Sequence, residues 1–342
     1  MELHHNLGAP LTRWLIRERS LPKPFVLLDV GVQGGIAGRW EALGDQLLVY
    51  GFDALEEVIA PLVAENKPNH HYFAIALGEE DGEESLYLQS NRCASSFYSQ
   101  AQSRFDIDAA NWREDAMRQV PVRRLDSLFD EGLVPPADFI KIDCEGYEPK
   151  VLKGAARFLE ASPLLGADLE TNFNVSPVLP DTHFWSTYQP LLHRRLMLFD
   201  ASFNRVPRAG FSNYIAGLYP KGVEPPGRFR PGTWNVLLAR DLIQDGESPS
   251  SYPWMPNVLV DVDAVLKSII ILELYGILDW AYDYLVAFRD ILSSQIDVDA
   301  AIRHVVPEPP VQPRRRGLLC RTESAIHKTM IRLYEKTTYM RR

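Results

Sequence analysis

A glycine-rich turn follows the first apolar run of the chain and is the first feature able to hold a ligand. Phe25–Val30 reads FVLLDV, and the next glycines are Gly31, Gly34 and Gly35. Glycines permit a tight turn and close approach of a ligand to the backbone. A helix that begins there offers free N–H groups. The spacing departs from GxGxxG, however, and Asp29 lies within the loop. A carboxylate there repels phosphate and accepts hydrogen bonds from an ammonium group, so the turn favours an ammonium-bearing nucleoside over a dinucleotide.

A second acid stands where a nucleoside ribose would lie. Asp53 ends the next apolar run, Leu47–Phe52, and comes 22 residues after Gly31. An acid about 20 residues past such a turn commonly accepts hydrogen bonds from ribose hydroxyls. The alternative is purely structural: the glycines only turn the chain, and Asp53 caps the following helix.

Further acids follow the run Phe139–Ile142. Asp143 ends this run, and Glu145, Gly146 and Glu148 come next. Ligands bind beyond the carboxyl ends of parallel strands. We therefore expect Asp143 and Glu145 to face the same crevice as Asp29 and Asp53. Four carboxylates around one crevice suit a cationic sulfonium ligand. Glu148 is expected in a solvated first turn of a helix.

Short apolar runs alternate with helix-compatible segments and predict the fold that positions these acids. The predicted strands are 25–30, 47–52, 71–77, 85–88, 120–125, 139–142, 164–169, 213–219 and 234–239, and the predicted helices are 37–43, 55–65 and 149–160. This order predicts an α/β protein with a Rossmann-like, doubly wound, mostly parallel sheet. The last two strands are expected to close the sheet as antiparallel edge strands, and a helical appendage follows.

The chain has 342 residues, of which 46% are hydrophobic and 24% are charged, as is usual for globular proteins. Changes in composition along the chain divide it into parts. The predicted parts are an N-terminal segment 1–23, a Rossmann-like domain 24–240, a linker 241–257, a helical region 258–306 and a basic tail 307–342. The helical region is expected to pack on the main domain or on a second copy of the chain.

Charge and cysteine content restrict the partners and the compartment. The net charge is −9, although residues 313–342 hold nine Lys or Arg against two Glu. The rest of the chain is therefore strongly acidic, and this argues against nucleic-acid binding by the main domain. The basic tail is interpreted as a solvated helix, or as a surface for anionic lipid or glycan. Three cysteines without metal-ligand spacing, and no secretory signal, favour the cytoplasm. The apolar stretch 268–278 is too short and too charged to span a bilayer.

The acidic segment Ile142–Ala155, IDCEGYEPKVLKGA, resembles the signature of the FkbM family of S-adenosylmethionine-dependent methyltransferases, whose pattern is close to IDxEGxExxVLxGA. DVGVQGG, VYGFDALEE, IALGEEDGEESLYL and VPVRRLDSLFDE resemble other family segments in the family's order. The resemblance covers residues 24–240. It departs at Asp53 and Ala54, where the family usually has Glu and Pro, and the last hundred residues match no pattern of the family.

The resemblance implies S-adenosylmethionine as cofactor and a set of positions that bind it. These positions are Asp29, Gly31, Gly34, Gly35, Asp53, Ala76 and Asp143. Methyl transfer needs alignment of the acceptor with the methyl group, and a hydroxyl acceptor needs a general base. The candidate catalytic residues are Asp143, Glu145, Glu170 and His183, the last in a loop after the strand 164–169. The loop 91–100 either covers the cofactor or acceptor or is an ordinary surface loop. Some related sugar O-methyltransferases use a divalent metal, but no ligand cluster in the sequence demands one.

The sequence therefore predicts a methyltransferase that methylates a hydroxyl of a sugar, glycan or secondary metabolite. One alternative is a non-catalytic binding protein that retains the fold. Another is a nicotinamide-dependent oxidoreductase, which would be expected to have GxGxxG and no acid in the glycine loop.

Overall fold

The computed structural model of the protein describes residues 8–99, 114–172, 183–192, 194–206, 230–243 and 260–306. The described residues all belong to one compact unit. The predicted basic tail, the predicted strand 213–219 and most of the predicted linker 241–257 lie outside the described residues.

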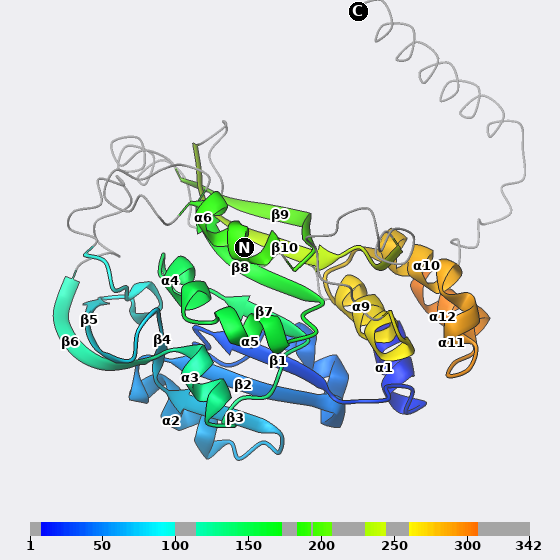
Figure 1. Ribbon diagram of the computed structural model, residues 1–342, viewed down its shortest axis with the longest axis horizontal. Coiled ribbons are helices and arrows are strands. Elements are labelled where there is room, and N and C mark those ends of the chain that lie inside the picture. Colours follow the sequence, from blue (N-terminus) through cyan, green and yellow to red (C-terminus); the bar gives the residue numbers. More distant parts are fainter. Residues whose placement is uncertain are drawn as a thin grey trace, which may run out of the picture. The chain divides into compact units, whose positions relative to one another are not determined.

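A seven-stranded sheet forms the centre of this unit (Figure 1). In spatial order its strands are β3 (His70–Ala74), β2 (Leu47–Asp53), β1 (Phe25–Val30), β7 (Phe139–Ile142), β8 (Gly166–Asn172), β10 (Arg230–Arg240) and β9 (Leu196–Val206). All pairs from β3 to β8 are parallel, whereas β10 is antiparallel to both β8 and β9. The predicted mostly parallel, doubly wound fold is confirmed. The strand order reverses between β1 and β7, which is where ligands bind in such sheets.

The antiparallel edge differs in one member from the expectation. The partner of β10 is β9, whose segment LMLFDASFNRV was not predicted as a strand. Its two exposed apolar side chains, Met197 and Leu198, are neighbours in sequence and interrupt the alternation that marks a half-buried strand.

A second, smaller sheet of three strands is also present. It contains β4 (Ala76–Leu77), β6 (Glu114–Arg123) and β5 (Gly82–Gln89) in that order. The predicted strand 71–77 is interrupted at Ile75, so that its first part pairs with β2 and its second part pairs with β6.

Helices cover both faces of the large sheet, as alternate residues of its strands require. One face packs on α3 (Leu125–Asp130), α4 (Glu148–Lys153), α5 (Ala156–Ala161) and α6 (Phe184–Leu192). The other packs on the 3-10 helix η1 (Gly38–Gln46) and on helices from both ends of the described chain. The helix α2 (Glu56–Ala64) packs beside β2 and β3. The predicted helix 149–160 is divided at Gly154 and Ala155, whose backbone angles leave the α-helical region. Gly154 packs closely on Gly78, because a Cβ there would lie 1.9 Å from the Gly78 carbonyl oxygen.

The helices of the predicted appendage pack on the sheet and share its core. They are α9 (Val262–Leu274), α10 (Leu278–Ala287), α11 (Arg289–Leu292) and α12 (Val298–Val305). Trp40 of η1 joins the layers, with its ring centroid 5.0 Å from that of Phe139 and 6.2 Å from that of Tyr275. The N-terminal helix α1 (Pro10–Arg17) lies beside α9 (Figure 1). None of the described helices combines the length and apolar character needed to cross a membrane.

Candidate functional site

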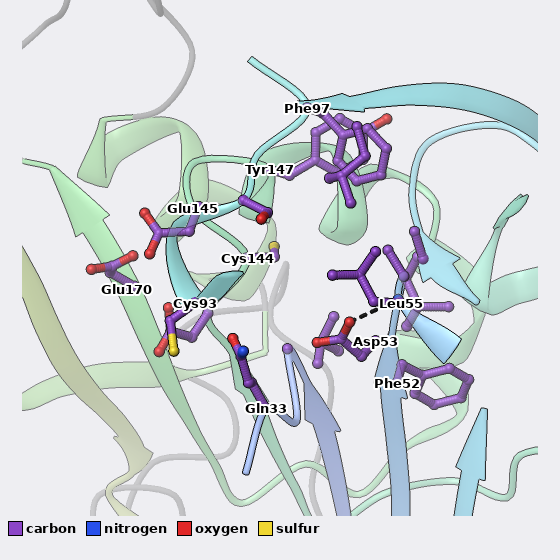
Figure 2. A pocket seen from close by; sticks show the side chains of 18 of the residues that line it. Gln33, Phe52, Asp53, Leu55, Cys93, Phe97, Cys144, Glu145, Tyr147 and Glu170 are labelled. Atoms are coloured by element: carbon purple, nitrogen blue, oxygen red, sulfur yellow. Dashed lines mark hydrogen bonds between the residues drawn. The ribbon is translucent and has the colours of Figure 1, made fainter. Parts of the chain in front are cut away.

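A pocket of about 370 Å³ opens at the carboxyl ends of β1, β2, β7 and β8, beside the reversal of strand order. This volume lies within the usual range of small-molecule sites, roughly 300–1,000 Å³. Figure 2 shows its two unlike ends, with Phe52, Asp53 and Leu55 at one and Glu145 and Glu170 at the other. The pocket therefore offers apolar contact and a single acid at one end and a concentration of carboxylates at the other.

The glycine turn brings the ends of β1 and β7 together at the floor of the pocket. Gly31 lines the pocket with φ 79° and donates its N–H to the carbonyl oxygen of Phe52 at 2.9 Å. A Cβ at this position would lie 1.9 Å from the Asp143 carbonyl oxygen, so no other residue fits. Gly34 and Gly35 also have positive φ but do not line the pocket. Only the first glycine of the turn therefore reaches the candidate cofactor position.

Asp53 lies in the pocket at the end of β2, as predicted for a ribose-binding acid. Its Oδ1 accepts a hydrogen bond from the N–H of Leu55 at 2.9 Å, so it also supports the start of α2. Burial raises the pKa of its carboxyl group. Ala76 lines the pocket as well, and together with Leu77, Leu86 and other apolar residues it forms a wall suited to a flat base. The hydrogen bond from Leu55 is to the residue before α2 and not to an N–H of its first turn, so Asp53 does not cap the helix, and ribose binding stays a prediction.

Asp29 lies below the pocket and does not line it. The residue is 4% exposed, and its Oδ1 is 3.3 Å from Nζ of Lys141. Burial raises the pKa of Asp29 to about 6, against the opposing effect of Lys141. A carboxylate already paired inside the protein is poorly placed to receive the ammonium group of a ligand.

Lys141 is a pocket residue that the sequence reasoning missed. Its Nζ donates to the carbonyl oxygen of Gly31 at 2.8 Å and lies 3.7 Å from Oδ2 of Asp143. Burial opposes its charge, but the neighbouring carboxylates, Asp29 first, raise the pKa of Lys141 above its ordinary value. Its position inside the apolar run FIKI could have identified it, because a cation within a buried strand needs acidic partners.

Three carboxylates meet at the other end of the pocket. Asp143, Glu145 and Glu170 each place an oxygen within 4.8 Å of the others. Burial, followed by the charges of Asp143 and Glu148, raises the pKa of Glu145 to about 8. Mutual repulsion between such carboxylates favours protonation of one of them or binding of a cation, and a carboxyl that titrates near neutral pH is suited to general base catalysis. The structure therefore brings together three of the four predicted catalytic residues.

The turn that carries Glu145 is held by Glu148, which was expected to be solvated and is instead 1% exposed. Its Oε1 accepts hydrogen bonds from the N–H groups of Cys144 at 2.9 Å and Gly146 at 3.2 Å. Glu145 has φ 56°, in the left-handed region that glycine favours. The expectation for Glu148 was wrong because its side chain folds back onto the turn. There burial raises the pKa of Glu148 to about 7, against those backbone bonds.

The loop 91–99 forms part of the pocket wall. Its residues Arg92, Cys93, Ser95 and Phe97 line the pocket. The ring of Phe97 lies 4.3 Å, centroid to centroid, from that of Tyr147, and Figure 2 shows the two rings together. The segment therefore contributes to the wall of the pocket, and its role in covering a cofactor or acceptor stays a prediction.

His183, the remaining predicted base, does not line the pocket. It precedes α6, where its Nδ1 accepts a hydrogen bond from the N–H of Ser186 at 3.3 Å. This is the position and role of a residue that caps a helix. Residues 173–182, between the end of β8 and His183, lie outside the described residues.

The sheet and the acidic pocket fall largely within a segment that matches a known family. A model of the Methyltransferase FkbM domain matches residues 37–199. The match confirms the resemblance to the FkbM family over residues 37–199. Comparison with curated proteins gives no match.

Solved structures of methyltransferases resemble the chain at low identity. The methyltransferase FkbM of Methylobacillus flagellatus KT is 15% identical, with a TM-score of 0.32, and the match covers 62% of this chain and 43% of that one. A SAM-dependent methyltransferase of Agrobacterium tumefaciens is 12% identical, with a TM-score of 0.34 and coverage of 67% and 60%. An O-methyltransferase of Bacillus cereus in complex with SAH is 12% identical, with a TM-score of 0.30 and coverage of 69% and 82%. This chain thus spans less than half of the FkbM structure.

Proposed function

We propose that the protein is an S-adenosylmethionine-dependent methyltransferase that methylates a hydroxyl group of a sugar or another polyhydroxylated molecule. The observation that carries the proposal is the two-ended pocket of a chain that matches the FkbM family over residues 37–199. Asp53 and an apolar wall lie at one end, and the carboxylates of Asp143, Glu145 and Glu170 lie at the other.

The first end has the groups that an adenosine moiety needs. The carboxylate of Asp53 would accept hydrogen bonds from the ribose hydroxyls, and the wall beside Ala76 would contact the adenine. The backbone of Gly31, which carries no side chain, permits close approach of the amino-acid moiety. Asp143 lines the pocket, and its backbone packs against Gly31, so its carboxylate would accept from the ammonium group, a role that the buried Asp29 is poorly placed to fill.

The second end has the groups that a hydroxyl acceptor needs. Bound S-adenosylmethionine would supply a methyl group on a sulfonium, which leaves as a neutral thioether. Glu145 or Glu170 would accept a hydrogen bond from the acceptor hydroxyl and take its proton as the new O–C bond forms and the S–C bond breaks. A polyhydroxylated acceptor also offers further hydroxyls to the remaining carboxylate oxygens, and that favours a sugar over a simple phenol.

Titration calorimetry with S-adenosylhomocysteine, followed by a screen of sugar and phenol acceptors with labelled S-adenosylmethionine, tests the proposal. We expect product-analogue binding and methylation of at least one sugar. E145Q and E170Q should each lower turnover about a hundredfold while leaving cofactor affinity within about twofold, because general bases contribute roughly 10²–10⁴-fold. E160Q, an exposed glutamate outside this pocket, is the matched control.

Other outcomes would overturn the proposal in different ways. Cofactor binding without turnover on any acceptor would favour a binding protein that retains the fold, and stabilisation by NAD alone would favour an oxidoreductase. Parallel assays with EDTA and with added Mg²⁺ determine whether the three carboxylates act on a proton or on a cation. Loss of activity in EDTA that added Mg²⁺ restores would assign a cation to the three carboxylates.

A further inference from the structure

A row of ionisable side chains crosses the large sheet directly beneath the pocket. Asp29 of β1, Lys141 of β7 and Asp168 of β8 are in register on three neighbouring parallel strands. Residues in register point to the same face of a sheet. That face is the one covered by η1 and α9, so the row lies between the cofactor turn and the helical region of the chain.

Lys141 connects this row to the cofactor turn. Its Nζ donates to the carbonyl oxygens of Gly31, at 2.8 Å, and Val30, at 3.3 Å. The same ammonium group lies 3.3 Å from Asp29 and 3.7 Å from Asp143. One cation therefore fixes these two carbonyls at the end of β1 and attracts carboxylates on both sides of them.

The opposite end of the row is attached to the helical region. Tyr275, which follows α9 directly and is 1% exposed, donates its hydroxyl hydrogen to Oδ2 of Asp168 at 2.7 Å. The guanidinium carbon of Arg39 lies 4.4 Å from the centroid of the Tyr275 ring. A hydrogen bond to a partly buried carboxylate is stronger than one between neutral groups. Tyr275 thus stabilises the charge of the carboxylate next to Lys141.

We propose that Lys141 is a positioning residue for the cofactor turn and that Tyr275 keeps it in place by hydrogen bonding to Asp168. The identity of the bound cofactor rests on the proposed function. The helical region is accordingly a supporting part of the methyltransferase site, although it lies more than a hundred residues beyond the signature segment in sequence.

The mechanism is a competition for one ammonium group. Asp29 and Asp143 lie within 4 Å of the Lys141 ammonium group, and Asp168 is its neighbour in register on β8. When Asp168 loses the Tyr275 hydroxyl, its carboxylate lacks that donor, and the ammonium group of Lys141 is the neighbouring cation that can replace it. Nζ then moves away from the carbonyl of Gly31, and the turn loses the contact that fixes its shape. Cofactor affinity should fall while the acceptor end of the pocket is unchanged.

Y275F tests the proposal, with Y284F as its matched control. Tyr284 is also a fully buried tyrosine of the helical region, and its hydroxyl donates to the Arg240 carbonyl at 2.7 Å and accepts from the Leu242 N–H at 2.8 Å. Both variants lose buried hydrogen bonds, but only Tyr275 touches the row. We expect Y275F to raise the Kd for S-adenosylhomocysteine about tenfold, the effect of losing one hydrogen bond to a charged group.

Calorimetry and thermal unfolding together separate the outcomes. Y284F should lower Tm at least as much as Y275F and leave the Kd within about twofold of the wild type. K141M, if circular dichroism shows that it is folded, should weaken binding more than Y275F and raise the KM for S-adenosylmethionine without raising that for the acceptor. Equal Kd values for Y275F and Y284F would overturn the inference. Absence of binding by the wild type would instead refute the proposed function.

Discussion

The hydroxyl of Ser96 donates a hydrogen bond to the carbonyl oxygen of Glu145 across 2.9 Å. Ser96 is 1% exposed, and its backbone is paired in both directions with Tyr87 of β5. The acid turn after β7 is thereby attached to the small sheet on one side, while Glu148 holds it on the other. Two independent contacts thus fix a residue whose left-handed backbone would otherwise cost about 1–2 kcal/mol.

S96A should lower turnover by about fivefold, because loss of roughly 1 kcal/mol of hydrogen bonding allows Glu145 to leave its position beside the other carboxylates. Cofactor affinity should remain unchanged, since Ser96 does not line the pocket. Steady-state kinetics and calorimetry with S-adenosylhomocysteine measure the two effects separately.

S162A is the control for this variant. Ser162 accepts a backbone hydrogen bond from Ala137 at 3.1 Å and lies outside the acidic pocket. If S162A and S96A had equal turnover, the contact with Glu145 would have no positioning role.

The sheet could be predicted from the sequence because its central strands are short, continuous apolar runs with an acid or glycine at the end. Phe25–Val30 and Phe139–Ile142 are observed with the predicted bounds. Their carboxyl ends must meet in a parallel sheet, so the crevice followed from the strands alone. The edge strand β9 and the division of α4 from α5 depend on tertiary contacts, and no local pattern indicates them.

The sequence could predict only those site residues whose place follows from their position at the end of a strand. Asp53 and Asp143 end predicted strands and do line the pocket. Asp29 also lies near a strand end, but side chains alternate along β1, so Asp29 faces the opposite side of the sheet from Val30. It is in register with Lys141. The inward fold of Glu148 and the contact of Tyr275 with Asp168 join residues whose proximity no spacing rule reveals.

D53A should raise the Kd for S-adenosylhomocysteine at least tenfold, because two hydroxyl hydrogen bonds to a carboxylate are lost. The variant also removes the acceptor for the Leu55 N–H, so a drop in Tm is expected as well. D241A provides the comparison, since Asp241 accepts from the Ile243 N–H at 3.1 Å in the same local arrangement outside the pocket. Calorimetry that gave D53A the wild-type affinity would refute the ribose assignment.

G31A should be far more destabilising than G34A, although both glycines have φ near 80°. A Cβ at Gly31 would meet the Asp143 carbonyl, which is backbone and cannot be displaced without separating β1 from β7. A Cβ at Gly34 would meet no atom within 4 Å. Urea unfolding should show a loss of more than about 3 kcal/mol for G31A and about 1 kcal/mol for G34A. Similar losses would mean that backbone strain alone requires these glycines.

E145Q should be more stable than the wild type at alkaline pH. The folded protein raises the pKa of Glu145 from 4.5 to about 8, so folding favours its protonated form. The resulting stability is present below the unfolded pKa and is lost as pH rises through about 8. Glutamine has no charge to develop, so the advantage of E145Q should increase between pH 5 and pH 9 to on the order of 1 kcal/mol, after allowance for solvent screening. Urea unfolding at three pH values measures the difference in the free energy of unfolding between E145Q and the wild type, with E160Q as the control. If this difference did not change with pH, the carboxylate of Glu145 would be exposed to solvent.

E273A should detach the N-terminal helix from the helical region. Glu273 of α9 is 3% exposed, and its carboxylate accepts from the N–H groups of Leu11 and Thr12, at 2.8 and 2.6 Å, and from the Thr12 hydroxyl at 2.6 Å. These N–H groups belong to the first turn of α1, where a carboxylate also interacts favourably with the helix dipole. Removing it leaves three buried donors without their acceptor, at a cost of about 3 kcal/mol or more.

The size of this loss can be judged against an ordinary helix cap. Asp261 caps α9 by accepting from the Ala264 N–H at 2.8 Å, and D261A should cost only about 1 kcal/mol. E273Q keeps one acceptor oxygen and should lie between the two variants. Protease digestion should release residues before α1 faster in E273A than in the wild type, because the first turn of α1 opens. A loss for E273A no larger than that for D261A would show that α1 is held by its apolar face alone.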